Sequence, residues 1–158
     1  MAVVRLRPFE PSDVDAMIAL FRDSVRVAAR GDYDEAQLRA WAPDDIDREA
    51  WAARAAGRAT LIAEVEGGMA GFADLLPTGH IDLFYVSAGH LRMGVATAML
   101  AEIERMAASQ GIRHLTVEAS ITARPFFEAR KFRVLAAQVV ERRGQRLTNF
   151  RMEKTLVP

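Results

Sequence analysis

The sequence predicts a single mixed α+β domain over residues 1–158, with a central, mostly antiparallel sheet of seven strands flanked by helices. Three features indicate this class. Short stretches alternate apolar with polar residues, as half-buried strands do, and longer stretches repeat apolar residues at helical spacing. Turn residues, mostly glycine and proline, separate these stretches. The resulting order of elements along the chain is β-ααα-βββ-α-β-α-ββ.

The first third of the chain is predicted to form one strand followed by three helices. Near the N-terminus apolar residues alternate with arginines, which is typical of a strand with one buried face. Beyond it, apolar residues recur at helical spacing, and serine or aspartate precedes the helical runs as an N-cap. The expected elements are a strand at Val4–Leu6, a helix capped by Ser12 that passes Val25, a short helix at 34–40, and a helix capped by Asp44 or Asp45 that runs to about Gly57.

Strands dominate the prediction for the rest of the chain. Gly67-Gly68 and Arg143-Gly144 are each predicted to form the turn of a hairpin. One long helix has a single apolar face and stops at Gly111, because glycine commonly follows the last residue of a helix. The expected strands are 59–65, 69–76, 80–86, 113–119, 132–142 and 145–154, and the expected helices are 94–110 and 120–130.

Composition excludes several classes of function. Lys+Arg and Asp+Glu both total 21, so the formal net charge is zero, and bulk nucleic-acid binding, which depends on excess basic charge, is not expected. The chain has no cysteine, which excludes disulfides and cysteine nucleophiles and fits a reducing compartment. The three histidines lack metal-ligand spacing, so no metal is expected. Residues 1–10 lack an apolar signal core, and no apolar run reaches the ~20 residues of a membrane span, so the protein is expected to be cytoplasmic without membrane association.

The segment Val86–Thr97 joins a predicted strand to the long helix through a turn of small residues. Unpaired backbone N–H groups converge at a helix start, where the helix dipole adds about half a positive charge. Gly94 and Ala96 are small enough to let an anion approach that backbone. The turn therefore suits a phosphate group, although an ordinary strand-to-helix connection can have the same composition.

The same turn resembles motif A of the GNAT acetyltransferases, Q/R-x-x-G-x-G/A, here Leu91 to Ala96. Thr116–Glu128 resembles the GNAT strand, loop and helix that flank the pantetheine arm of acetyl-CoA, and the element order also matches. The segments Ala40–Pro43 and Glu118–Phe127 are similar to those of small, uncharacterised bacterial members of the family. The resemblance implies the GNAT fold, acetyl-CoA as co-substrate, and transfer of its acetyl group to an amine by direct attack in a ternary complex.

In that family the backbone at the start of the long helix grips the pyrophosphate, and neighbouring residues hold the rest of the cofactor. The resemblance implies that a backbone N–H at the end of the fourth strand, at Val86 or a neighbour, polarises the acetyl carbonyl. Carried onto this sequence, the residues implied to bind acetyl-CoA are Tyr85, Val86, Leu91, Arg92, Met93, Gly94, Val95, Ala96, Thr97, Ser120, Phe127 and Arg130.

Three positions depart from the family pattern. Leu91 stands where the family has Gln or Arg, so pyrophosphate binding would rest on the backbone, with Arg92 adding charge. Phe127 stands where many members have the tyrosine that protonates the departing thiolate, so the usual general acid is missing. Lys131 replaces the glycine that usually precedes Phe132.

The predicted strand 80–86 offers candidates for the catalytic base. His80 and Asp82 lie two residues apart and are expected to share one face with Phe84 and Val86. His80 falls where some family members have a glutamate base, and a histidine whose pKa lies near neutrality suits proton removal from an ammonium group. Asp82 is expected to orient His80 or to bind a cationic substrate. The alternative is structural: His80 ends a turn, and Asp82 pairs with a surface arginine.

The first two helices and their loop cover the acceptor side in this family. Tyr33 and Trp41 either wall the acceptor pocket there or belong to the core, and Trp51 is expected in the core. The acceptor, a small-molecule amine or a protein amine, is not defined by the sequence. A non-catalytic module that senses acetyl-CoA is the alternative function. The last strand is expected to be available for pairing with a second copy, as in a homodimer.

Overall fold

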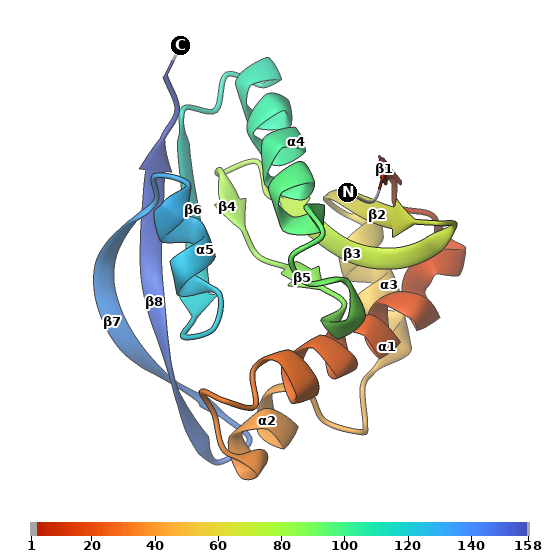
Figure 1. Cartoon of the computed structure of the whole chain (residues 1–158), viewed down its shortest axis with the longest axis vertical. Coiled ribbons are helices and arrows are strands. Elements are labelled where there is room, and N and C mark those ends of the chain that lie inside the picture. Colours follow the sequence, from red (N-terminus) through yellow and green to blue (C-terminus); the bar gives the residue numbers. More distant parts are fainter. Residues whose placement is uncertain (1–2, 158) are drawn as a thin grey trace.

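The computed structural model describes residues 3–157, and they form two four-stranded sheets with helices packed against them (Figure 1). One sheet has the order β1-β2-β3-β5, and the other has the order β4-β6-β8-β7; every pairing is antiparallel except that of β4 with β6. The strands are β1 (Val4–Pro8), β2 (Ala59–Val65), β3 (Gly68–Leu75), β4 (His80–Ile81), β5 (Phe84–Val86), β6 (His114–Ser120), β7 (Arg133–Arg142) and β8 (Gln145–Thr155). The α-helices are α1 (Val14–Asp23), α2 (Glu35–Trp41), α3 (Arg48–Ala56), α4 (Val95–Ser109) and α5 (Arg124–Ala129), with 3-10 turns at Pro11–Asp13 and Ala88–His90 and a π-helical turn at Ser24–Ala28.

The mixed α+β class is confirmed, but the single seven-stranded sheet is wrong. The predicted strand 80–86 consists of two short strands, β4 and β5, and Asp82 and Leu83 belong to neither. β4 pairs with β6 whereas β5 pairs with β3, so the break assigns the two halves to different sheets. The expected single strand face running from His80 to Val86 does not exist for the same reason.

A buried aspartate holds this break in place. Asp74, on β3, has no exposed surface, and its Oδ1 atom accepts the backbone N–H groups of Asp82 and Leu83, both at 2.9 Å. Its Oδ2 atom accepts a hydrogen bond from Arg58 Nη1 at 2.9 Å. Burial raises the pKa of the Asp74 carboxyl, and the Leu83 N–H and Arg58 act against that rise. The N–H groups of Asp82 and Leu83 lie outside the strands, and the Asp74 carboxylate provides the hydrogen-bond acceptor that a strand partner would otherwise provide.

Two hydrophobic clusters pack on opposite faces of the first sheet, one under α4 and the other under α1. Side chains of β2 alternate between them, Leu61 toward α4 and Ile62 toward α1. Gly71 on β3 allows α4 to approach closely, because a Cβ atom there would lie 2.9 Å from Tyr85 O and 3.0 Å from Val95 Cγ1. This packing sets α4 directly behind β5 and so positions the helix start beside the site.

The predicted helix caps at Ser12 and at Asp44 or Asp45 are wrong. Ser12 lies inside the 3-10 turn before α1, where the Asp13 carboxylate accepts a backbone N–H at 2.8 Å. Asp47 caps α3, because its side chain accepts a backbone N–H of the first helical turn at 3.1 Å. The side-chain cap of α3 is therefore formed by Asp47, the residue immediately before the helix.

The last strand is not free to pair with a second copy, because β8 lies between β6 and β7. The edges of the second sheet are β4 and β7. Within residues 3–157 no helix is long and apolar enough to cross a membrane. No group of three or more His, Asp or Glu side chains in that part of the chain is arranged to hold a metal ion.

Candidate active site

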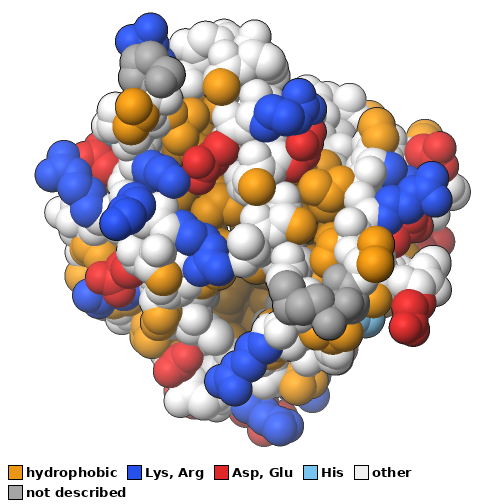
Figure 2. Space-filling view, turned by 45° about the horizontal axis from the view of Figure 1, so that its top comes forward, with side chains coloured by type: hydrophobic (Ala, Val, Ile, Leu, Met, Phe, Trp, Pro, Cys, Tyr) orange, Lys and Arg blue, Asp and Glu red, His pale blue; other side chains and the backbone are white. Residues whose placement is uncertain are grey.

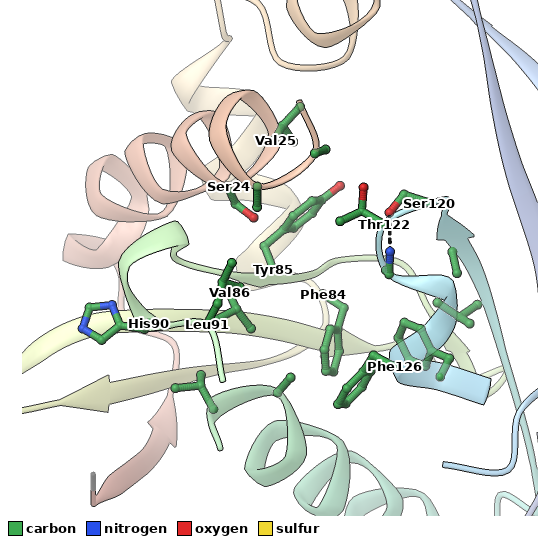
Figure 3. Close-up of a pocket in the computed structure, with 18 of the residues that line it drawn as sticks. Ser24, Val25, Phe84, Tyr85, Val86, His90, Leu91, Ser120, Thr122 and Phe126 are labelled. Atoms are coloured by element: carbon green, nitrogen blue, oxygen red, sulfur yellow. Dashed lines mark hydrogen bonds between the residues drawn. The ribbon is translucent and has the colours of Figure 1, made fainter. Parts of the chain in front are cut away.

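A cavity of about 510 Å³ lies where the two sheets part, between β5 and β6. Its walls come from these strands, from α5, from the turn before α4, and from the π-helical turn that follows α1 (Figure 3). In the space-filling view the surface is hollowed over an apolar floor, with Lys and Arg side chains beside the opening (Figure 2). The volume is in the range of small-molecule and cofactor sites.

The backbone of β5 presents hydrogen-bonding groups to this cavity. Leu83 O accepts a hydrogen bond from β3 at 3.0 Å, and Ser87 N donates one to β3 at 2.8 Å. Because backbone groups alternate in direction along a strand, the N–H and C=O groups of Phe84 and Val86 point away from β3 and toward the gap. The N–H group implied to polarise a carbonyl, at Val86 or a neighbour, therefore lies on the cavity side.

The start of α4 is open to an anion. Gly94 precedes the helix with φ 86°, in the left-handed region that favours glycine, and no side chain in the described part of the chain caps the helix. The first helical hydrogen bond runs from Ala98 N to Gly94 O at 3.0 Å. The N–H groups of the first turn therefore have no helical acceptor, and the helix dipole makes this end positive.

Arg130 adds a cation beside this helix start. Its Nη2 atom donates to Thr97 Oγ1 at 2.6 Å, and its guanidinium carbon lies 4.0 Å from the centre of the Phe126 ring. Leu91 is 47% exposed and contributes no charge. The positive character of this end of the cavity therefore comes from the helix backbone, Arg92 and Arg130.

All the residues predicted to bind acetyl-CoA line this cavity except Met93. Met93 packs instead against the hydrophobic cluster under α4. Sequence reasoning did not assign Phe84 and Phe126 to the site, although their rings lie 5.3 and 5.2 Å from that of Phe127 and form an apolar wall. The adjacent phenylalanines in the segment after β6 were the available signal. No sequence signal marked the π-helical turn as part of the site, because its sequence continues the helical pattern of α1.

A second cavity, of about 730 Å³, adjoins the first. It is lined by residues at the end of α2, by α3, and by the β7–β8 hairpin. Five residues line both cavities and are called the junction below: Trp41, Asp82, Tyr85, Glu118 and Ser120. A molecule in one cavity can therefore meet a molecule in the other at these residues.

Both predicted candidates for the base are engaged with neighbours. His80 Nδ1 lies 2.8 Å from Thr116 Oγ1, and His80 lines only the second cavity. Asp82 lies at the junction, but its Oδ2 atom is 2.6 Å from Arg58 Nη1. Asp82 is thus paired with an arginine, as the structural alternative predicted, and is not held against His80.

Glu118 is a junction carboxylate that sequence reasoning did not assign a role. It is exposed, and its side chain forms no ion pair or hydrogen bond within residues 3–157. Asn149, opposite Ser120 on β8, has a buried Oδ1 atom with no hydrogen-bond partner among the same residues, and it lines the second cavity. The alternation along β6, which puts Thr116, Glu118 and Ser120 on one face, was the available signal.

Tyr33 and Trp41 differ in how they meet the second cavity. Tyr33 is 6% exposed; its hydroxyl donates to Thr148 O at 2.6 Å and accepts from Ile121 N at 2.9 Å, so it belongs mainly to the core. Trp41 is half-buried at the junction, and its Nε1 atom donates to the hydroxyl of Tyr85 at 3.3 Å. Burial raises the pKa of Tyr85 to about 12.

Residues 29–155 match a family model for an acetyltransferase (GNAT) domain. The chain is 34% identical over 149 residues to YafP, an uncharacterized N-acetyltransferase of Escherichia coli strain K12, and the match covers 94% of each chain. A crystal structure of a GCN5-related N-acetyltransferase from Rhodopseudomonas palustris superposes with a TM-score of 0.94 and 36% identity, over 99% of this chain and 98% of that one. PaiA N-acetyltransferase from Thermoplasma acidophilum, solved in complex with coenzyme A, superposes with a TM-score of 0.80 and 17% identity, over 97% and 99%.

The two solved structures share the fold of this chain. The protein belongs to the GNAT acetyltransferase family, as the family model and the Escherichia coli relative show.

Proposed function

We propose that the protein transfers the acetyl group of acetyl-CoA to an amine, by direct attack of the amine in a ternary complex. The observation that carries this proposal is the junction, where a cavity that starts at an uncapped helix end meets a second cavity lined by polar groups. Family membership supports acetyl transfer, and the coenzyme A complex of PaiA supports the choice of acyl donor.

The residues of the first cavity fit acetyl-CoA as the donor. The free N–H groups at the start of α4, with Arg92 and Arg130, suit the negative charge of a pyrophosphate. Phe84 and Phe126 give an apolar wall for the pantetheine arm. The outward N–H groups of β5 are available to its amides and to the acetyl carbonyl, where a fixed donor stabilises developing negative charge. Acetyl-CoA supplies the activated acyl group.

The residues of the second cavity fit an amine acceptor. The unpaired Glu118 carboxylate and the unpartnered Asn149 Oδ1 atom are acceptors for an ammonium group. Only the neutral amine attacks a carbonyl, so a base must first remove a proton. His80 is the proposed base, acting through water from its place on the second cavity, and Glu118 holds the amine. A small-molecule amine and an exposed protein amine both meet these requirements.

The experiment combines binding with turnover. Acetyl-CoA should raise the melting temperature, and addition of a panel of amines should release free CoA thiol only when the correct amine is present. A melting temperature unchanged at saturating acetyl-CoA would contradict the proposal. Binding without thiol release from any small amine or peptide would instead favour the sensor alternative, which the changes at Leu91 and Phe127 had suggested.

A further inference from the structure

Acetyl transfer leaves a thiolate that must gain a proton, and the position at which many relatives place a tyrosine for this purpose is Phe127. Phe127 is 2% exposed and packs among the rings of Phe84, Phe126 and Phe132. It has no proton to give. We propose that Tyr85 gives the proton to the departing sulfur of coenzyme A, an inference that rests on the proposed acetyl transfer.

Tyr85 is in the right place for this role. It is the only phenol among the junction residues, and it comes from β5, whose neighbouring residues Phe84 and Val86 turn their backbone groups into the gap. The Tyr85 hydroxyl points across the gap toward the loop that carries Ser120 and Thr122 (Figure 3). Because Tyr85 lines both cavities, a thioester that reaches from the first cavity to an amine in the second comes to the junction to which Tyr85 belongs.

The hydrogen bonds of Tyr85 leave its proton available. Trp41 Nε1 donates to the Tyr85 oxygen at 3.3 Å, so the tyrosine is the acceptor in that contact. Within residues 3–157 the Tyr85 hydroxyl donates no hydrogen bond, and the contact with Trp41 is the only one it accepts. Burial raises the pKa of Tyr85 to about 12, so the phenol is protonated and its O–H is present to donate to the sulfur as the C–S bond breaks. The Trp41 N–H then stabilises the phenolate that remains.

The other hydroxyl groups near the junction are less suited. Tyr33 already donates to Thr148 O, and Thr122 already donates to Asp32 at 2.7 Å. Ser120 accepts a hydrogen bond from Ala123 N at 3.0 Å and retains its own proton, but an aliphatic alcohol is a much weaker acid than a phenol. Ser120 is therefore the rival that the experiment must separate from Tyr85.

The proton balance of the step is complete. The amine, after losing one proton to the base, forms the new C–N bond with the acetyl carbon. As the C–S bond breaks, sulfur keeps the bonding electron pair and takes the Tyr85 hydroxyl proton, which yields neutral CoA thiol. The nitrogen carries a surplus proton once the C–N bond has formed and loses it as the amide forms, and this proton returns to the Tyr85 phenolate through water that enters the second cavity.

A binding measurement tests the inference without relying on turnover. The pKa of the thiol of bound CoA can be measured from the ultraviolet absorbance of the thiolate as a function of pH. A phenol that donates to the thiolate stabilises it, so Tyr85→Phe should lower the acid dissociation constant of the bound thiol roughly tenfold. Tyr33→Phe is the matched control, because it removes the same atom from a hydroxyl that already has two partners, and the dissociation constant should not change. An unchanged constant in Tyr85→Phe, with CoA bound, overturns the inference.

Kinetics separate this inference from the proposed function. If the wild-type protein transfers acetyl groups, Tyr85→Phe should lower kcat about 100-fold with little change in the KM for acetyl-CoA, since general acid catalysis commonly contributes that much. Ser120→Ala, which removes the rival hydroxyl from a residue that also lines both cavities, should lower kcat far less than Tyr85→Phe does. An active wild-type protein with an equally active Tyr85→Phe variant, or a kcat loss confined to Ser120→Ala, overturns the role of Tyr85 alone. A wild-type protein that releases no thiol with any amine removes the proposed function, on which this inference rests, and so overturns both.

Discussion

The Oδ1 atom of Asp74 accepts the backbone N–H of Leu83 at 2.9 Å, and this contact marks the point at which one expected strand becomes two. The same atom accepts the N–H of Asp82, so a single buried carboxylate replaces the strand partners of two consecutive residues. β4 then continues beside β6, and β5 beside β3. The gap that contains both cavities depends on this separation.

Replacing Asp74 should therefore destabilise the fold strongly. Asp74→Ala leaves two backbone N–H groups and the Arg58 guanidinium without their buried acceptor, and the free energy of unfolding should fall by about 3 kcal/mol or more. Asp82→Asn is the control: the Asp82 side chain is 39% exposed and pairs with the same arginine, so its loss should cost less than about 1 kcal/mol. Urea denaturation measures both, and equal losses would contradict this account.

Replacing Gly79 should destabilise the fold, because its backbone lies in close contact with β6 just before β4 and leaves no room for a side chain. It has φ 90°, and a Cβ atom there would lie 2.2 Å from His114 O. Gly79→Ala should lower the free energy of unfolding by about 2–5 kcal/mol, through both backbone strain and steric overlap. Gly111 also has positive φ but open space around it, so Gly111→Ala should cost only the strain, about 1–2 kcal/mol. Equal thermal destabilisation of the two variants would refute the steric explanation.

The ion pair of Asp13 and Arg7 should make stability fall in acid. The hydrogen bond from Arg7 lowers the pKa of the Asp13 carboxyl below 3.8, so the carboxylate contributes stability that is fully present above pH 3.8. That stability is lost as pH falls through the lowered pKa, because the folded state must then bind a proton it disfavours. Asp13→Asn and Arg7→Gln should each flatten this part of the stability curve, measured by denaturation between pH 5 and 2. A curve unchanged in both variants would show that other carboxyl groups dominate.

Replacing His80, the proposed base, and replacing Glu118, the proposed amine-binding residue, should change the kinetics in different ways. His80→Ala should reduce the rate most below neutral pH, where the amine is hardest to deprotonate and a base is most needed. Glu118→Gln should instead raise the KM for the amine at every pH, about tenfold, because it removes a charged acceptor for the ammonium group. Full pH–rate profiles for both variants test this division. A His80→Ala profile parallel to that of the wild type would remove His80 as the base.

Local patterns were enough to predict the mixed α+β class, the order of elements apart from the split strand, and the glycine turn that precedes α4. Gly94 illustrates why: its left-handed conformation and the apolar face of α4 are properties of adjacent residues. The break at Asp82 could not be predicted in this way, since residues 80–86 alternate as one strand would and the carboxylate that interrupts them comes from β3. The roles proposed for Glu118 and Tyr85 depend likewise on partners far along the chain, namely the β6–β8 pairing that places Asn149 nearby and the indole of Trp41.

Direct acetyl transfer at the junction requires that both substrates be bound together before the acetyl group moves, and steady-state kinetics test this requirement most directly. Initial rates of CoA thiol release should be measured while acetyl-CoA and the preferred amine are both varied. We predict double-reciprocal lines that intersect, and no thiol release without the amine. Parallel lines, together with an acetylated protein detected by mass spectrometry after incubation with acetyl-CoA alone, would contradict direct transfer between the two cavities.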